Sequence, residues 1–343
     1  MRSTWANLTA AAVVLSVMGA AGAAPPEAVL NLYTSRHYQS DESIYAGFTA
    51  QTGIRINRIE GKGDALIARI KSEGANSPAD VLITVDAGRL WRAEQAGLFQ
   101  RVTSKLLEAR IPPQLRQPEG RWFGFSQRAR LIFYNKGRIA PGEIKTYEDL
   151  ADPKWRGQVC IRSSSNIYNL SLLGSIISAH GAEAAEAWAK AVVANFARDP
   201  QGGDTDQIRS VAAGECGIAV ANSYYYARLL TSPKAKDRNV AKAVGVVFPN
   251  QDDRGTHVNI SGAGVLKAAR HTAAAIRFLE YLASDTAQRI FADGNNEYPV
   301  VESVAPNAAL QSLGDFKRDT LNVGQYGANQ PLAQRIFDRA GWK

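Results

Sequence analysis

Several residue types that build metal and catalytic centres are scarce in this chain. Both methionines, Met1 and Met18, lie near its start, so the remainder holds no thioether. The other sulfur comes from two cysteines, and the chain has only four histidines. This small supply of soft ligands argues against a site for a soft metal ion.

Motifs for nucleotide binding and nucleophilic hydrolysis are also missing. A complete G-x-G-x-x-G fingerprint and a Walker loop do not occur. Gly61-Lys62-Gly63 and Gly262-Ala263-Gly264 each lack the third glycine, and we interpret both as turns. A G-x-S-x-G elbow is absent and no Ser, His and Asp grouping stands out. An exported hydrolase is therefore the least favoured class, and the chain is not expected to be an enzyme.

Long basic or apolar runs do not occur beyond the first residues. The net charge is +8, which favours anions or acidic surfaces as partners. Lysine and arginine are scattered, however, with no run beyond pairs, so no nucleic-acid partner is expected.

The N-terminus predicts export. Met1-Arg2 supplies a positive start, and the small and apolar run over 10–22 falls short of the about 18 residues that span a bilayer. Ala21-Gly22-Ala23 fits a cleavage site, so residues 1–23 are predicted to be a signal peptide and the protein to be periplasmic. In that oxidising compartment Cys160 and Cys216 are expected to form a disulfide.

Strand and helix patterns alternate along the chain. The first part contains strand patterns at 28–33, 54–59 and 80–85, and helix patterns at 40–50, 64–73 and 87–96. The second part contains strand patterns at 159–161 and 217–220, and helix patterns at 170–179, 182–196 and 206–213. Such alternation predicts parallel strands with right-handed crossovers.

The sequence thus predicts an α/β protein of two lobes, each a mixed sheet flanked by helices. An extended stretch over 122–134 is long enough to run from one lobe into the other as a hinge strand. We expect lobe one to comprise 28–130 plus about 260–305, and lobe two 131–259 plus about 306–343.

Tyr224-Tyr225-Tyr226 is the most unusual stretch. It follows the strand pattern at 217–220, and a helix is expected to start behind it at Ala227. Ligands of open α/β sheets bind at such carboxyl ends of strands. Other strand ends carry further polar residues, namely Arg36, His37 and Tyr38 in lobe one and Ser163 to Ser165 and Tyr168 in lobe two.

Phenol is the group that these loops share. A small trivalent cation stabilises phenolate, and hard anionic oxygen suits Fe³⁺. Mg²⁺ and Ca²⁺ would require carboxylates, which do not cluster in these loops. The residues therefore favour iron as the cargo. The alternative is an organic or anionic solute that stacks on the aromatic rings and accepts hydrogen bonds from Ser163 to Ser165.

At these residues the chain resembles periplasmic ferric-iron-binding proteins of bacterial ABC importers, most closely a tyrosine-rich branch. The resemblance covers nearly the whole mature chain. Its motifs are Tyr33-Thr34-Ser35-Arg36-His37-Tyr38, Ser72-Glu73-Gly74-Ala75-Asn76-Ser77-Pro78-Ala79-Asp80, Leu90-Trp91-Arg92-Ala93-Glu94, Asp152-Pro153-Lys154-Trp155, Ile161-Arg162-Ser163-Ser164-Ser165-Asn166, Asn195-Phe196-Ala197-Arg198 and Gly255-Thr256-His257-Val258-Asn259.

The resemblance implies the periplasmic binding protein fold and delivery of Fe³⁺, with Fe²⁺ as the alternative, to an inner-membrane ABC permease. It implies these metal ligands: His37, Tyr38, Tyr168, Tyr224 and Tyr225. The histidine position in this branch either coordinates the metal ion or does not, and Tyr226 is expected to pack or to form part of the cleft wall. A monomer is expected.

Four phenolates exceed the charge of Fe³⁺ by one, and burying that excess is costly unless it is compensated. We expect nearby arginines to offset it, with these candidates: Arg36, Arg128, Arg130, Arg162 and Arg228. Because tyrosines fill the positions where the wider family uses His, Glu and a bound anion, a co-bound anion is left open.

Overall fold

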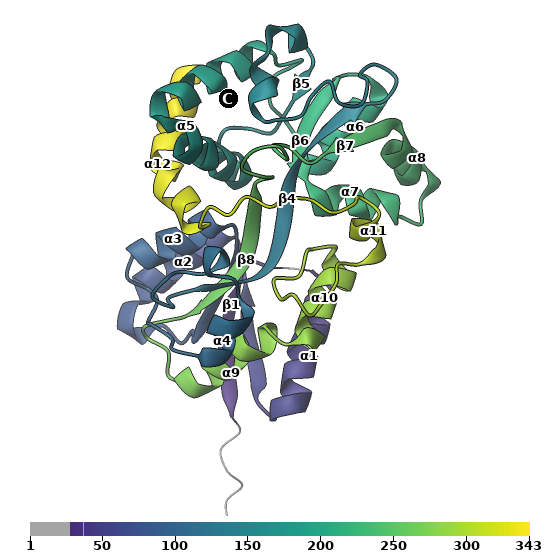
Figure 1. The fold of residues 1–343 in the computed structure, drawn as a ribbon. Coiled ribbons are helices and arrows are strands. Elements are labelled where there is room, and N and C mark those ends of the chain that lie inside the picture. Colours follow the sequence, from purple (N-terminus) through teal and green to yellow (C-terminus); the bar gives the residue numbers. More distant parts are fainter. Residues whose placement is uncertain (1–27, 37) are drawn as a thin grey trace, which may run out of the picture.

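A computed structural model describes residues 28–36 and 38–343 (Figure 1). The predicted signal peptide over 1–23 and the candidate ligand His37 lie outside the described residues. Within the described ranges, no helix is both long and apolar enough to cross a membrane.

The first lobe is built on three parallel strands that alternate with helices, as the sequence pattern predicts. The strands are β1 (Val29–Thr34), β2 (Arg55–Glu60) and β3 (Val81–Val85), and the helices are α1 (Asp41–Thr52), α2 (Gly63–Glu73) and α3 (Ala87–Gln95). β1 pairs in parallel with both β2 and β3. The carboxyl end of β1 therefore delivers the loop that contains Arg36 and Tyr38.

Two long antiparallel strands connect the lobes (Figure 1). β4 (Phe123–Asn135) pairs through Phe123 to Ala129 with β8 (Val258–Val265), and β8 also pairs with β3 of the first lobe. From Arg130 onward β4 pairs instead with strands of the second lobe. One strand thus belongs to both sheets, which is the role expected of a hinge strand.

The second lobe is built around the far half of β4. Its strands are β5 (Val159–Cys160), β6 (Ile218–Asn222) and β7 (Val244–Val247), and its helices are α5 (Ile167–Ala194), α6 (Asp204–Ala213), α7 (Ser223–Leu230) and α8 (Ala235–Ala243). β5 and β6 are parallel, so the loops after them leave the same edge of the sheet. Tyr168 follows β5 and the tyrosine triplet follows β6.

Further helices complete both lobes. They are α4 (Lys105–Arg110), α9 (Thr272–Leu282), α10 (Asp285–Asn295), α11 (Ala308–Gln311) and α12 (Gly324–Ala340), with 3₁₀ turns at Gly74–Asn76, Pro113–Leu115, Glu148–Ala151 and Pro153–Trp155. α3, α5 and α12 lie on one side of the crossing strands, and α1, α7 and α10 lie on the other (Figure 1).

Each lobe is stabilised by apolar clusters of its own. One cluster packs around β1, β3 and α1 in the first lobe, with Leu32 and Phe48 among its fully buried members. Two others lie on the two faces of the second sheet, one around Trp188 and the other around Phe133. Burial of this apolar surface is the main stabilising term within each lobe.

The lobes also meet directly where α12 crosses α3. Gly327 of α12 faces Trp91 so closely that a Cβ atom at Gly327 would lie 2.3 Å from the Trp91 Cβ. Beside this contact the buried Asp86 carboxylate accepts hydrogen bonds from Ser171 Oγ (2.7 Å) of α5 and Asn259 Nδ2 (2.9 Å) of β8. One carboxylate of the first lobe therefore links the hinge and the second lobe.

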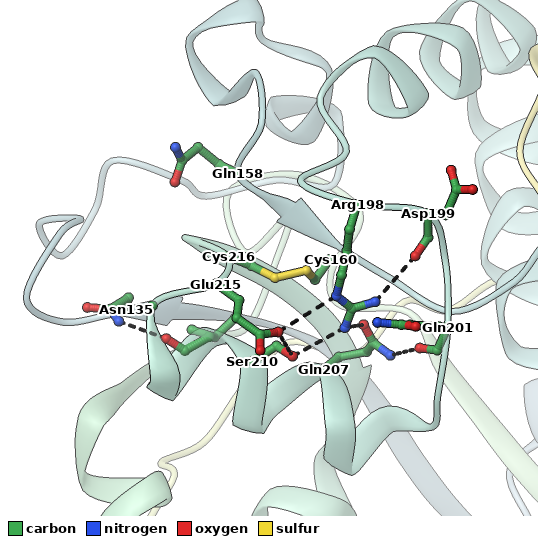
Figure 2. The surroundings of a disulfide bond; sticks show 12 residues. Asn135, Gln158, Cys160, Arg198, Asp199, Gln201, Gln207, Ser210, Glu215 and Cys216 are labelled. Carbon is green, nitrogen blue, oxygen red and sulfur yellow. Dashed lines mark hydrogen bonds and ion pairs between the residues drawn. A yellow bond between two sulfur atoms is a disulfide. The ribbon is translucent and has the colours of Figure 1, made fainter.

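The predicted disulfide between Cys160 and Cys216 is present (Figure 2). Both cysteines are fully buried. The bridge joins β5 to the residues that lead into β6, beside the ion pair of Arg198 with Glu215. It therefore fastens the two strands whose ends carry Tyr168 and the tyrosine triplet.

Two local predictions, a turn and the start of a helix, were wrong. Gly262-Ala263-Gly264 is not a turn, because it lies inside β8, where the missing side chains allow close neighbours. A Cβ atom at Gly262 would lie 2.6 Å from the Phe123 carbonyl oxygen. The helix after β6 begins at Ser223 rather than Ala227, so the tyrosines occupy its first turn.

Candidate metal centre

Tyr168 is positioned by the polar loop that opens α5. Asn166 caps the helix by accepting a hydrogen bond from the Tyr168 backbone N–H at 3.1 Å. Asn169 donates to the carbonyl oxygens of Arg162 (2.8 Å) and Ser163 (3.1 Å), which fixes the loop to the helix. Because both cap and loop are held, the half-buried Tyr168 ring has a defined direction.

Helical geometry divides the tyrosine triplet. Consecutive residues of a helix point about 100° apart, so three neighbours cannot share one face. Tyr224 and Tyr225 lie together, with ring centroids 4.2 Å apart. Tyr226 points into the core, where its ring lies 5.3 Å from Phe133 and its hydroxyl donates to the Ala241 carbonyl at 3.0 Å. Tyr226 packs, as the sequence predicts.

Phenols from both lobes converge on one place. The hydroxyl oxygens of Tyr168 and Tyr224 lie 3.4 Å apart. Tyr38 comes from the first lobe, and Arg228 of α7 spans the gap between them. The guanidinium carbon of Arg228 lies 5.1 Å from the Tyr38 ring centroid and 5.0 Å from that of Tyr224. The structure thus brings together the four tyrosines that the sequence singled out as ligands.

A cavity opens beside this cluster. It has a volume of about 840 Å³ and lies between α1, α7 and the end of α10. Its lining residues are Tyr38, Gln39, Ser40, Glu42, Ser43, Arg228, Gly294 and Asn295. Solvent and small solutes can therefore reach Tyr38 and Arg228 from outside.

Burial favours the protonated form of these phenols when no metal ion is bound. Desolvation raises the pKa of Tyr38, Tyr168 and Tyr225, and it raises the pKa of Tyr224 well above its ordinary value. Charged neighbouring phenolates would raise the pKa of Tyr224 further. Several phenolates can share this site only if a cation of high charge joins them, which is the chemistry of a hard trivalent ion.

The five candidate arginines lie around the tyrosines, and four of them are ion-paired. Arg36 pairs with Asp41 (2.9 Å) and Glu297 (3.0 Å), and Arg128 also pairs with Glu297 (2.8 Å). In the second lobe Asp204 pairs with Arg130 (2.6 Å) and Arg162 (3.4 Å). Arg228 pairs with no carboxylate of the described residues, and its contacts are with the tyrosine rings.

The arginines around the tyrosines outnumber the carboxylates that pair with them. The five guanidiniums face three carboxylates, those of Asp41, Glu297 and Asp204, which leaves a charge of +2 around the site as a whole. Arg228, which lies between Tyr38 and Tyr224, contributes one of these charges. Positive charge therefore surrounds the place where the four phenolates would form.

Two buried carboxylates near the tyrosines and arginines were not predicted from the sequence. Asp204 and Glu297 are buried close to the site, although no carboxylate cluster was expected in the loops. Asp204 is the first residue of α6, and Glu297 follows α10. Neither lies in the loops that carry the tyrosines. Only the need to balance the charge of the arginines could have suggested these two carboxylates from the sequence. Among the described residues, no group of three or more His, Cys, Asp or Glu side chains could hold a metal ion.

The described histidines are engaged elsewhere. His257 is buried beside β8, and its ring centroid lies 4.4 Å from that of Tyr326. His180 contacts Glu148 at 2.9 Å, and His271 contacts Asp80 at 3.0 Å. They contribute to the hinge and to the ends of helices.

Fold and site together define a two-lobe solute-binding protein. Residues 76–317 match the family model of bacterial extracellular solute-binding proteins, and the chain belongs to this family. Iron uptake protein A1 of Synechocystis sp. is 55% identical over 314 residues, which cover 92% of this chain and 87% of that protein.

Solved structures agree with this assignment. The Trichodesmium protein IdiA (FutA), in complex with iron and citrate ligands, is 58% identical with a TM-score of 0.90, covering 92% of this chain and 100% of that one. The ferric binding protein of Campylobacter jejuni is 42% identical with a TM-score of 0.87, at coverages of 92% and 100%. The expected family and two-lobe fold are confirmed.

Proposed function

We propose that this protein binds ferric iron between its lobes and delivers it to an inner-membrane ABC permease. The observation that carries the proposal is the convergence of Tyr38, Tyr168, Tyr224 and Tyr225 around Arg228. The relatives named as iron uptake and ferric binding proteins support the same cargo. The protein acts as an exported binding protein of the periplasm, and no catalysis is part of this role.

The four tyrosines would coordinate the ion as phenolates. His37, which is next to Tyr38 in the sequence, is the fifth candidate ligand. Fe³⁺ with four phenolates carries a net charge of −1, and the net +2 of the surrounding arginines and carboxylates outweighs it. Ferric iron fits this shell better than ferrous iron, because Fe²⁺ stabilises fewer phenolates.

Binding would proceed in two stages. Tyr168, Tyr224 and Tyr225 all belong to the second lobe and form a preorganised half-site. Tyr38 would join when the lobes close about β4 and β8, which we propose divide the chain into 28–130 plus about 260–305 and 131–259 plus about 306–343.

Visible absorbance tests this function. Iron bound by tyrosinate should give the ferric protein a charge-transfer band, and Tyr224→Phe and Tyr225→Phe should each weaken iron binding and reduce the band. Tyr226→Phe is the matched control, because it removes a neighbouring phenol that faces the core. A colourless ferric complex, or Tyr224→Phe and Tyr225→Phe variants that bind iron like the control, would contradict the proposal.

A further inference from the structure

Glu297 is a buried carboxylate that the ligand set does not use. Glu297 is only 1% exposed and is the second residue after the end of α10. Asn296, in the left-handed conformation with φ 56°, turns the chain after the helix. Tyr298 then exchanges two backbone hydrogen bonds of 2.8 Å with Gln127 of β4. Glu297 is therefore fixed between a helix end and the hinge strand.

Both oxygens of this carboxylate hold arginines of the site. Oε2 accepts from Arg36 Nη1 at 3.0 Å, and Oε1 accepts from Arg128 Nη2 at 2.8 Å. Ser261 Oγ accepts from the same two guanidiniums. The network joins the loop after β1, the hinge strands β4 and β8, and the segment after α10.

The network reaches the proposed ligand of the first lobe. The Arg36 guanidinium carbon lies 4.9 Å from the Tyr38 ring centroid. Burial would raise the pKa of Glu297, but Arg36 and Arg128 outweigh burial and hold that pKa below its ordinary value. The carboxylate is therefore a permanent negative charge near Tyr38, and it opposes the field of both arginines there.

We propose that Glu297 is a positioning residue that sets the ferric preference of the iron site, holding Arg36 against Tyr38 and supplying a fixed negative charge. This inference rests on the proposed function. A negative charge near a metal ion stabilises its higher oxidation state, because Fe³⁺ is attracted more strongly than Fe²⁺. The negative charge of Glu297 thus offsets the positive charges of Arg36 and Arg128, which would otherwise favour Fe²⁺.

Variants with opposite changes of charge test this role. Glu297→Gln removes one negative charge and keeps the shape, whereas Arg36→Gln removes one positive charge from the same network. The midpoint potential of the bound iron should shift to more positive values in Glu297→Gln and to more negative values in Arg36→Gln. The ratio of ferric to ferrous affinity should fall by about tenfold in Glu297→Gln. Glu297→Asp, which retains the charge, should restore most of that ratio.

The control is Glu148→Gln, which removes another ion-paired carboxylate, the partner of Arg254 and His180 in the second lobe. It should leave the potential of the bound iron unchanged. Shifts of the same sign in Glu297→Gln and Arg36→Gln, or no shift in either, would overturn the inference. If Glu297→Gln does not fold, as judged by thermal unfolding of the iron-free protein, Arg36→Gln and Glu297→Asp decide the outcome.

Different results would contradict the proposed function and the role of Glu297. Wild-type protein that takes up no Fe³⁺ and shows no charge-transfer band would contradict the proposed function itself. Wild-type protein with coloured iron and a Glu297→Gln variant of identical potential would contradict only the role of Glu297.

Discussion

Tyr168 and Tyr224 hold their hydroxyl oxygens 3.4 Å apart although they are 56 positions apart in the chain. Tyr168 opens α5 and Tyr224 lies in the first turn of α7. At this separation two phenolates would repel each other strongly in a buried site unless a cation lay between them. The proposed site would therefore hold the pair as neutral phenols without a metal ion and as phenolates with one.

Removing Tyr168 should weaken iron binding without unfolding the protein. Tyr168→Phe keeps the ring in the capped first turn of α5 but removes the hydroxyl that faces Tyr224. We expect the ferric affinity to fall roughly 10- to 100-fold, the effect of losing one charged contact. Competition with a chelator measures this change, and an affinity equal to that of Tyr226→Phe would show that Tyr168 is no ligand.

Iron binding should release protons and strengthen as pH rises. Burial raises the pKa values of Tyr38, Tyr168, Tyr224 and Tyr225, so each phenol is protonated near neutral pH when no metal ion is bound. Coordination by all four would release about four protons per ion. Calorimetry in buffers of different ionisation enthalpy counts them, and a release of at most one proton would contradict a phenolate shell.

His257 should make the protein less stable in mild acid. Burial lowers its pKa from 6.5 to about 3, with Arg130 and Arg254 acting in the same direction. Below pH 6.5 His257 is protonated in the unfolded chain but remains neutral in the folded protein. The free energy of unfolding therefore falls as the pH falls from 6.5 toward 3. Between about pH 7 and 4.5 the loss should be roughly 2 to 3 kcal/mol.

Urea unfolding at the two pH values measures this effect. His257→Gln should lose much less stability over that interval, whereas His180→Gln, at an exposed position, should behave as wild type. Equal pH dependence in all three proteins would contradict the assignment.

The disulfide should contribute substantially to stability. Cys160 and Cys216 close a loop with a sequence separation of 56, for which chain entropy predicts about 4 kcal/mol. Urea unfolding of a Cys160→Ala, Cys216→Ala double variant should show a loss of about this size. An unchanged unfolding midpoint would mean that packing of β5 on β6 suffices, and thiol counting on denatured wild type verifies that the bridge is formed.

The α3–α12 contact should tolerate no added methyl group. In Gly327→Ala the new Cβ would lie 2.3 Å from Trp91, so the helices must separate at the interface between the lobes. Overpacking of this kind costs about 1 to 3 kcal/mol, and we expect iron affinity to change although no ligand is altered. Gln325→Ala, at an exposed position of the same helix, is the control for both measurements.

Much of the local structure was determined by the sequence itself. The alternating patterns before residue 97 predicted β1 to β3 and α1 to α3 closely, because buried parallel strands and amphipathic helices have distinct periods. The disulfide followed from two cysteines in an exported chain. The tyrosines were predicted to be ligands from their place at strand ends and from the family resemblance, because an isolated phenol does not by itself indicate an iron site.

Tertiary structure decided which segments of the chain lie side by side. Gly262 and Gly264 resembled a turn in sequence, and only the close approach of β4 explains why they lie within a strand. The pairing of Arg36 and Arg128 with Glu297 joins residues from three separate segments, and a charge balance has no local signal in the sequence. Side-chain type and period are local properties, whereas the sum of charges around a buried site exists only once the chain has folded.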